Sequence, residues 1–124
     1  TTGLSGIPGL ISFGHGVPGD ILSAAPFVAI ANAGSAYELN IVVTPGSLGD
    51  SRYTDTIPAD AFRFVINGVT KYYNPTTGKF TYYKSTPAAA DGDAYTITPR
   101  VSIPFVTVGT YTGSMTFTID EVSQ

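Results

Sequence analysis

The side chains that could do chemistry are few, and none of them stands in a catalytic pattern. His15 is the only histidine, it is flanked by Gly14 and Gly16, and the chain has no cysteine. General-base catalysis needs an orienting partner and a nucleophile beside the imidazole, and a multi-histidine metal site needs more than one histidine. The sequence therefore predicts a protein that is not an enzyme and uses no cofactor, with His15 in a surface or structural role.

Two loop carboxylates, Asp91 and Asp93, are weak candidates for calcium ligands. They are separated only by Gly92. Calcium takes six or more oxygen ligands, often from clustered loop carboxylates, and this tripeptide supplies two. We therefore expect solvated turn residues here and no metal site.

Tyrosine occurs in two adjacent pairs, Tyr72 with Tyr73 and Tyr82 with Tyr83. Neighbouring residues of a strand point to opposite faces, so each pair predicts one inward and one outward ring. Two outward rings on neighbouring strands would form a platform for sugar rings. The alternative is a cross-strand aromatic pair, which stabilises a sheet by about 0.2–1 kcal/mol.

The composition excludes two classes of partner. Charged residues make up 12% of the chain, the net charge is −3, and the six basic residues are scattered. Nucleic-acid binding needs clustered Lys or Arg, so no nucleic-acid role is expected. No apolar run approaches the ~20 residues that cross a bilayer, so the chain is not expected to span a membrane.

Residues 1–19 differ in composition from the sandwich expected over residues 20–124. Six glycines punctuate this segment, yet it carries five large apolar residues: Leu4, Ile7, Leu10, Ile11 and Phe13. A flexible linker would not normally carry such residues. The segment must therefore dock, either on its own domain or on a neighbouring subunit.

The remaining chain reads as strands. Residues 37–44 alternate between apolar and polar, the mark of a strand with one buried face. Asn67-Gly68 separates two strand-like runs and predicts a type I′ hairpin, and a second turn leads to residues 80–84, which predicts a three-stranded meander. The strand expected over residues 95–105 contains Pro99 and Pro104, which cannot donate to a ladder, so we expect it to lie at a sheet edge or to be bulged. With no helical period, the sequence predicts an all-β, Ig-like or jelly-roll-type antiparallel β-sandwich of about seven to nine strands.

Three short motifs suggest a family. They are Ile11-Ser12-Phe13-Gly14 followed by Val17-Pro18-Gly19-Asp20; Tyr37-Glu38-Leu39-Asn40-Ile41 with the later Thr56-Ile57-Pro58; and the run from Val108 to Ile119. In this order the chain resembles secreted prokaryotic Ig-like sandwich domains of the spore-coat-protein-U, WxL and fimbrial-subunit kind. The resemblance implies a secreted or cell-surface location in a prokaryote, a role in surface structure, adhesion or fibre assembly, and no enzyme activity.

Two functions follow as hypotheses. The favoured one is a structural subunit of an extracellular filament, pilus or surface layer. Its N-terminal segment would add as a strand to a neighbouring copy, with Leu4, Ile7, Leu10, Ile11 and Phe13 filling a groove. The alternative is a carbohydrate-binding or adhesive module of a larger surface protein, whose partner would be a polysaccharide or a host surface.

Overall fold

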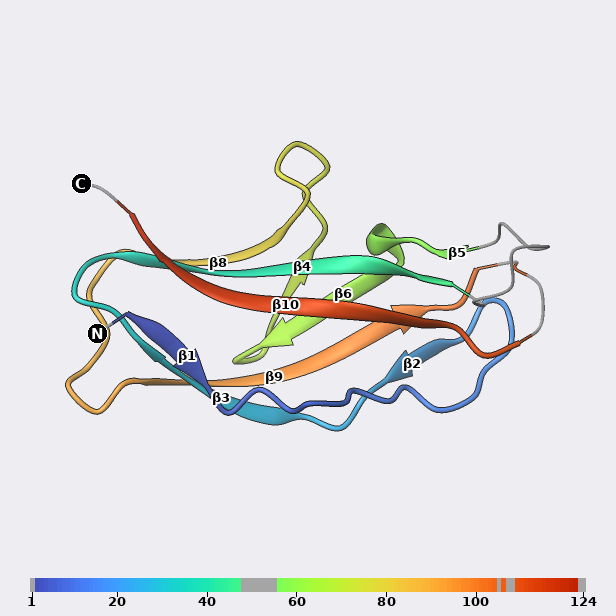
Figure 1. The fold of residues 1–124 in the computed structure, drawn as a ribbon, viewed down its shortest axis with the longest axis horizontal. Helices are drawn as coiled ribbons and strands as arrows, with labels where there is room; N and C mark the ends of the chain where they lie inside the picture. Colours follow the sequence, from blue (N-terminus) through green and yellow to red (C-terminus); the bar gives the residue numbers. More distant parts are fainter. Residues whose placement is uncertain (1, 48–55, 105, 107–108, 123–124) are drawn as a thin grey trace.

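In the computed structural model the chain folds into two antiparallel β-sheets that pack face to face (Figure 1). The structure describes residues 2–47, 56–104, 106 and 109–122. The antiparallel β-sandwich is confirmed, with ten strands in the described residues rather than seven to nine. Nowhere in the described chain is there a helix with the length and hydrophobicity of a membrane span.

One sheet has six strands in the order β1–β3–β9–β6–β7, with β2 also pairing with β9. The other has four, in the order β10–β4–β5, with β8 also pairing with β4. The elements are β1 (Gly3–Ser5), β2 (Ile21–Ser23), β3 (Phe27–Asn32), β4 (Tyr37–Ser47), β5 (Thr56–Ile57), the 3-10 turn η1 (Ala59–Ala61), β6 (Phe62–Ile66), β7 (Val69–Tyr72), β8 (Phe80–Lys84), β9 (Asp93–Ser102) and β10 (Thr112–Glu121).

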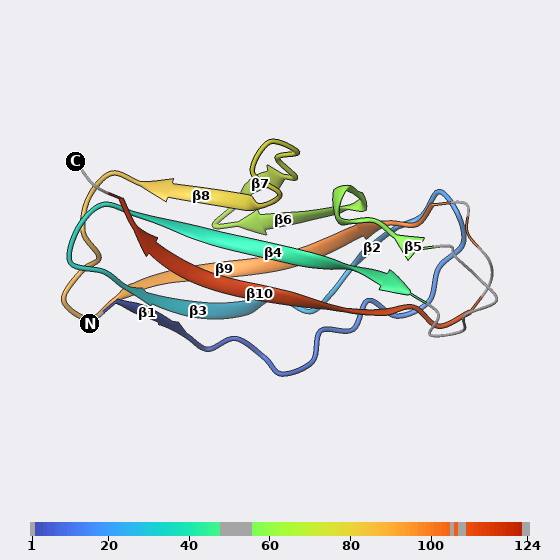
Figure 2. The same cartoon turned by 45° about the horizontal axis from the view of Figure 1, so that its top comes forward.

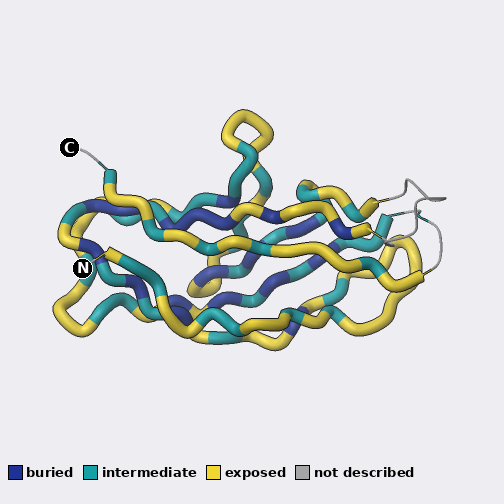
Figure 3. The backbone as a smooth tube through the Cα atoms, in the orientation of Figure 1, coloured by how far each residue is buried: buried dark blue, intermediate teal, exposed yellow. Residues whose placement is uncertain are grey.

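The core lies between the sheets and is centred on Phe64. Its ring meets Phe80 of the opposite sheet edge to face, with ring centroids 4.8 Å apart, and Phe117 at 6.1 Å. Such aromatic pairs stabilise by about 0.5–1.5 kcal/mol beyond the area that they bury. Figure 3 shows the buried stretches in the strands and the exposed ones in the loops and much of the N-terminal chain. The alternating apolar residues of β4 face this core, as the sequence predicts.

The hairpin between β6 and β7 is confirmed, and the meander is wrong. Asn67 and Gly68 have φ angles of 49° and 81°, which a type I′ turn requires. After β7 the chain crosses to the other sheet, where β8 pairs with β4 instead of β7. Either sheet buries the inward residues of β8, so alternation alone could not tell which sheet the strand joins.

Of the two alternatives for the strand that contains Pro99, the edge position is wrong, because β9 lies inside the six-stranded sheet, and the irregularity lies in the chain opposite β9. Pro99 is tolerated there by a break in the neighbouring strand. Its carbonyl accepts a hydrogen bond from Ala24 N at 2.9 Å, so its nitrogen faces the junction of β2 and β3. Ser23 is opposite Arg100 and Phe27 is opposite Ile97, so a four-residue advance along one chain faces a three-residue advance along β9, which is a β-bulge. Because the regular hydrogen-bond ladder is interrupted at this bulge, the missing N–H of Pro99 breaks no ladder bond. Pro104 lies beyond the end of β9.

Close backbone packing at a second register shift predicts the effect of a glycine substitution. The pairing of β10 with β4 shifts between Thr112 and Ser114, and a Cβ on Gly113 would stand 2.6 Å from Thr44 O. We expect Gly113→Ala to lower the free energy of unfolding by about 1–3 kcal/mol, as overpacking does, measured by urea denaturation.

Gly3→Ala is the control, because a Cβ at position 3 has no atom within 4 Å. It should change the free energy of unfolding by less than about 0.5 kcal/mol. Equal changes in the free energy of unfolding for the two substitutions would show that the register shift between β10 and β4 can accommodate a side chain at position 113.

Candidate functional site

The N-terminal segment, residues 2–19, lies along an open side of the sandwich. Its only strand is β1, which pairs with β3 in the same chain, with Leu4 opposite Ala31. The chain then runs beside β3 and β10 to the end of the molecule where β2 begins (Figure 2). Gly6 makes the departure from β3 possible: its φ is 86°, and a Cβ would stand 2.5 Å from Val28 O.

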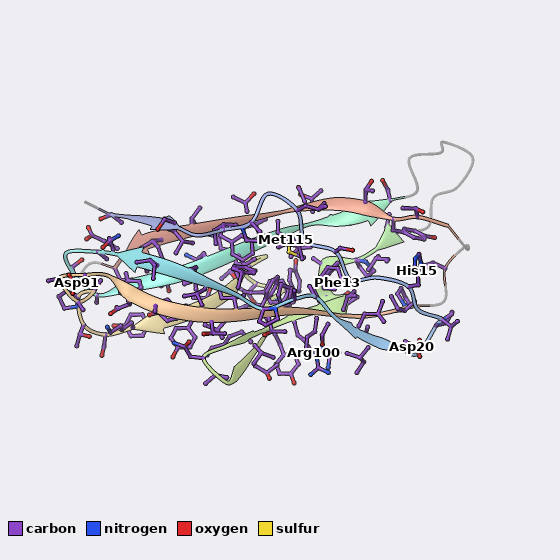
Figure 4. The ribbon with its side chains drawn as sticks, turned by 90° about the horizontal axis from the view of Figure 1, so that it is seen from below. Phe13, His15, Asp20, Asp91, Arg100 and Met115 are labelled. Carbon is purple, nitrogen blue, oxygen red and sulfur yellow. The ribbon has the colours of Figure 1, made fainter. Side chains whose placement is uncertain are left out.

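A groove of about 830 Å³, here called the lateral groove, lies beneath this segment. Both sheets line it, and the segment itself forms one wall. The sheet residues include Leu22, Val43, Phe62, Val101, Met115 and Phe117. Phe13 enters it and meets Phe62 edge to face, with ring centroids 5.7 Å apart. Figure 4 shows Phe13 and Met115 near each other within the sandwich.

The five apolar residues predicted as groove-filling do not behave alike. Leu4, Ile7 and Phe13 are half-buried against the core of their own chain. Ile11 is also half-buried, whereas the Leu10 side chain is 83% exposed. The segment is therefore docked through some of its apolar residues and leaves one of them uncovered.

Strand β10 adds an unpaired edge to this side. Within the described residues its ten-residue backbone pairs only with β4. It contains no proline, lysine or arginine, and its two charged residues, Asp120 and Glu121, stand at its C-terminal end. A long edge without such blocking residues is a template for pairing with another chain.

The four tyrosines of the two adjacent pairs differ in exposure. Tyr72 on β7 and Tyr83 on β8 are 64% and 51% exposed, and their strands belong to different sheets. Tyr73 packs against Phe80, and Tyr82 packs against Tyr95 with ring centroids 5.3 Å apart. The two exposed rings are therefore not a pair on neighbouring strands of one sheet.

The remaining sequence candidates are separated. His15 is exposed at the outer end of the lateral groove, and Asp91 is exposed in the turn before β9 (Figure 4). The Asp93 carboxylate instead accepts hydrogen bonds from groups of its own chain. Among the described residues no three metal-ligating side chains lie close enough together to hold an ion.

Asp93 belongs to a polar cluster that joins the two sheets and that sequence reasoning missed. Its carboxylate accepts hydrogen bonds from Lys84 Nζ and Tyr37 Oη, each at 2.6 Å, and from Ala89 N at 3.2 Å. Tyr37 also shares a hydrogen bond with Tyr95. Tyr37 and Asp93 are 56 residues apart in sequence, so no local sequence pattern predicts their contact.

The protonation states in this cluster follow from its contacts. Burial opposes the charge of Asp93, but the hydrogen bonds from Lys84 and Tyr37 outweigh it and hold the pKa of Asp93 below its ordinary value. The hydrogen bond to Asp93 raises the pKa of Lys84. Burial is the main cause that raises the pKa of Tyr37. At neutral pH the cluster is thus an ion pair with a neutral phenol, which ties the sheets together and has no free base.

A scan against protein-family models finds no match, and searches of curated proteins and of solved structures find none either.

The depressed pKa of Asp93 predicts a pH-dependent contribution to stability. Asp93→Asn removes the ion pair and should lower the free energy of unfolding at pH 7 by about 1–2 kcal/mol. A carboxyl group whose pKa is lower in the folded state stabilises above its unfolded value of about 3.9 and loses this effect as the pH falls through the folded value. Denaturant titrations should therefore show the gap between variant and parent narrowing below about pH 4.

Asp91→Asn is the matched control, because Asp91 is exposed two residues away. It should leave stability within about 0.5 kcal/mol of the parent at every pH. A gap for Asp93→Asn that persists undiminished at low pH would contradict the ion-pair account.

Proposed function

We propose that this protein is a non-catalytic structural subunit of an extracellular filament, pilus or surface layer of a prokaryote. Copies would assemble by exchanging their N-terminal segments. The observation that carries this proposal is the position of that segment: it lies over the lateral groove beside the unpaired edge of β10. Only its residues Gly3–Ser5 are paired as a strand.

Exchange between copies would keep the contacts of the segment. A segment that leaves its own groove and enters that of a neighbour makes the same apolar contacts, as in domain swapping. The reversal before β2 is a local turn, in which Asp20 N donates to Val17 O at 3.0 Å and Val17 N donates to the Asp20 carboxylate. Opening this turn would direct the segment outward. Pairing with β10 of the neighbour would then add hydrogen bonds that the single chain lacks.

The low charge content of the chain supports permanent burial against other copies. Charged residues form 12% of the chain, about half the ~25% typical of soluble proteins. Desolvating charges on assembly is expensive, and hydroxyl-bearing side chains such as those of Thr112, Thr116 and Thr118 on exposed positions of β10 cost less to bury where they find hydrogen-bond partners.

The alternative, a carbohydrate-binding or adhesive module, is favoured by one observation. Tyr72 exposes most of its ring on the outer side of the six-stranded sheet. This function does not compete with assembly for the same residues, because the lateral groove lies on another side of the molecule.

A disulfide that locks the segment in its own chain tests assembly. Ser5 and Ile30 are cross-strand partners in β1 and β3, and the natural chain has no cysteine. Ser5→Cys with Ile30→Cys should form filaments when reduced, and only discrete particles when oxidised before assembly, as seen by negative-stain electron microscopy.

Val65→Cys with Thr70→Cys is the control pair, since these residues are cross-strand partners in β6 and β7, away from the segment. Oxidation of this pair should leave filaments unchanged. Two results would contradict the exchange model: filaments formed by the oxidised Ser5→Cys, Ile30→Cys variant, and discrete particles formed by both the reduced variant and the parent.

A further inference from the structure

Two arginines stand directly opposite each other on the outer face of the six-stranded sheet. Arg63 of β6 pairs with Arg100 of β9, and the flanking partners in the same row are Tyr72 on β7 and Ser23 on β2. The neighbours of Arg63 in β6 are buried, so its side chain points away from the core. Figure 4 shows Arg100 on the side of β9 away from Phe13 and Met115. We call these four residues the arginine row.

The arginine row places two like charges on adjacent strands. Like charges directly opposite on neighbouring strands destabilise a sheet. The chain has only six Lys and Arg residues and a net charge of −3, yet two of its cations occupy one cross-strand pair. Within the described residues neither arginine has a carboxylate partner. Two cations without a carboxylate partner leave this face of the sheet open to an external anion.

The contacts of both guanidinium groups leave donors free for such an anion. Arg100 Nε donates to Ser23 Oγ at 3.1 Å, a neutral partner. Arg63 lies over the Tyr72 ring, 5.8 Å from its centroid, and its buried Nε has no acceptor. A guanidinium presents five donors in a planar fork that matches the two oxygens of a carboxylate. These contacts direct Arg63 toward β7 and Arg100 toward β2, so each guanidinium group can present its remaining donors to a carboxylate of its own.

We propose that the arginine row binds a carboxylate-bearing polysaccharide, a polyuronate. Carboxylates of successive sugars would accept hydrogen bonds from Arg63 and from Arg100, and the apolar face of a sugar ring would lie on the exposed part of Tyr72. Three strand spacings separate the ends of the row, about 14 Å, so it suits a chain of sugars better than a single one. This site is independent of the exchange of N-terminal segments.

The exposed ring decides between a sugar and an acidic protein segment. A protein carboxylate would satisfy the arginines but would make no use of Tyr72, which is 64% exposed even with Arg63 over its ring. A uronic acid offers a carboxylate and a ring face together. Hydroxyl groups from Ser23 and the outward Thr98 lie on the same sheet face for hydrogen bonds to sugar hydroxyls.

Binding of an oligogalacturonate of defined length, measured by isothermal calorimetry with the full chain, tests the site. Arg63→Gln and Arg100→Gln should each weaken binding at least about tenfold, the loss expected for a charge-assisted contact. Lys79→Gln removes one positive charge from the turn after β7 and should stay within about twofold, as a surface charge outside the contact does. The methyl ester of the same oligomer should not bind, and acetate should not compete at the same concentration.

Thermal unfolding separates a binding role from a structural one. Arg100→Gln removes one of the two like charges and should leave the midpoint of the free protein unchanged or higher, while abolishing the stabilisation by oligogalacturonate. Three results would each overturn the proposal: no binding by the parent, equal binding of the methyl ester or of acetate, and arginine variants that bind the oligomer normally but fail to form filaments. The last result would assign the row to contacts between subunits.

Discussion

The gap between the edges of the two sheets is the constraint on which the rest of the fold depends. Where β10 ends one sheet and β2 and β3 border the other, apolar core residues such as Phe62 and Met115 would face water. Burying apolar surface stabilises by roughly 25 cal/mol per Å², so a cover is strongly favoured. Residues 2–19 provide it, with Phe13 inserted between the sheets. The cover is one short strand and an extended stretch, a form that a second copy could supply equally well.

The two ends of the sandwich are held by different interactions. At the end where β4 begins, Tyr37, Lys84 and Asp93 join the sheets through an ion pair and a phenol hydrogen bond. At the other end the sheets meet through the lateral groove and the segment over it. The polar cluster of Tyr37, Lys84 and Asp93 fixes one arrangement of the sheets, because replacing its partners by water would lower the free energy of unfolding. Apolar contacts along an extended segment have no such directionality, which is why the proposed exchange is placed at the lateral groove.

The sequence predicts local features and fails at long-range ones. The Asn67-Gly68 hairpin and the alternation along β4 follow from neighbouring residues. Within the N-terminal segment, Leu4, Ile7 and Phe13 pack against the core of their own chain, whereas Leu10 is exposed, and composition alone could not separate them. The edge placement of residues 95–105 fails because Pro99 is accommodated by the bulge between β2 and β3, a property of another strand. The opposition of Arg63 and Arg100 likewise depends on the register of strands 37 residues apart, which no spacing in the sequence reveals.

Filaments grown from two single-cysteine chains give the most direct test of segment exchange. One chain carries only Ser5→Cys and the other only Ile30→Cys, so no single chain can close the bond. After assembly of an equal mixture and oxidation, exchange predicts disulfide-linked heterodimers on a non-reducing gel, because position 5 of one copy lies beside position 30 of the next. Filaments that yield only uncrosslinked chains would show that each segment stays on its own subunit and would contradict the account.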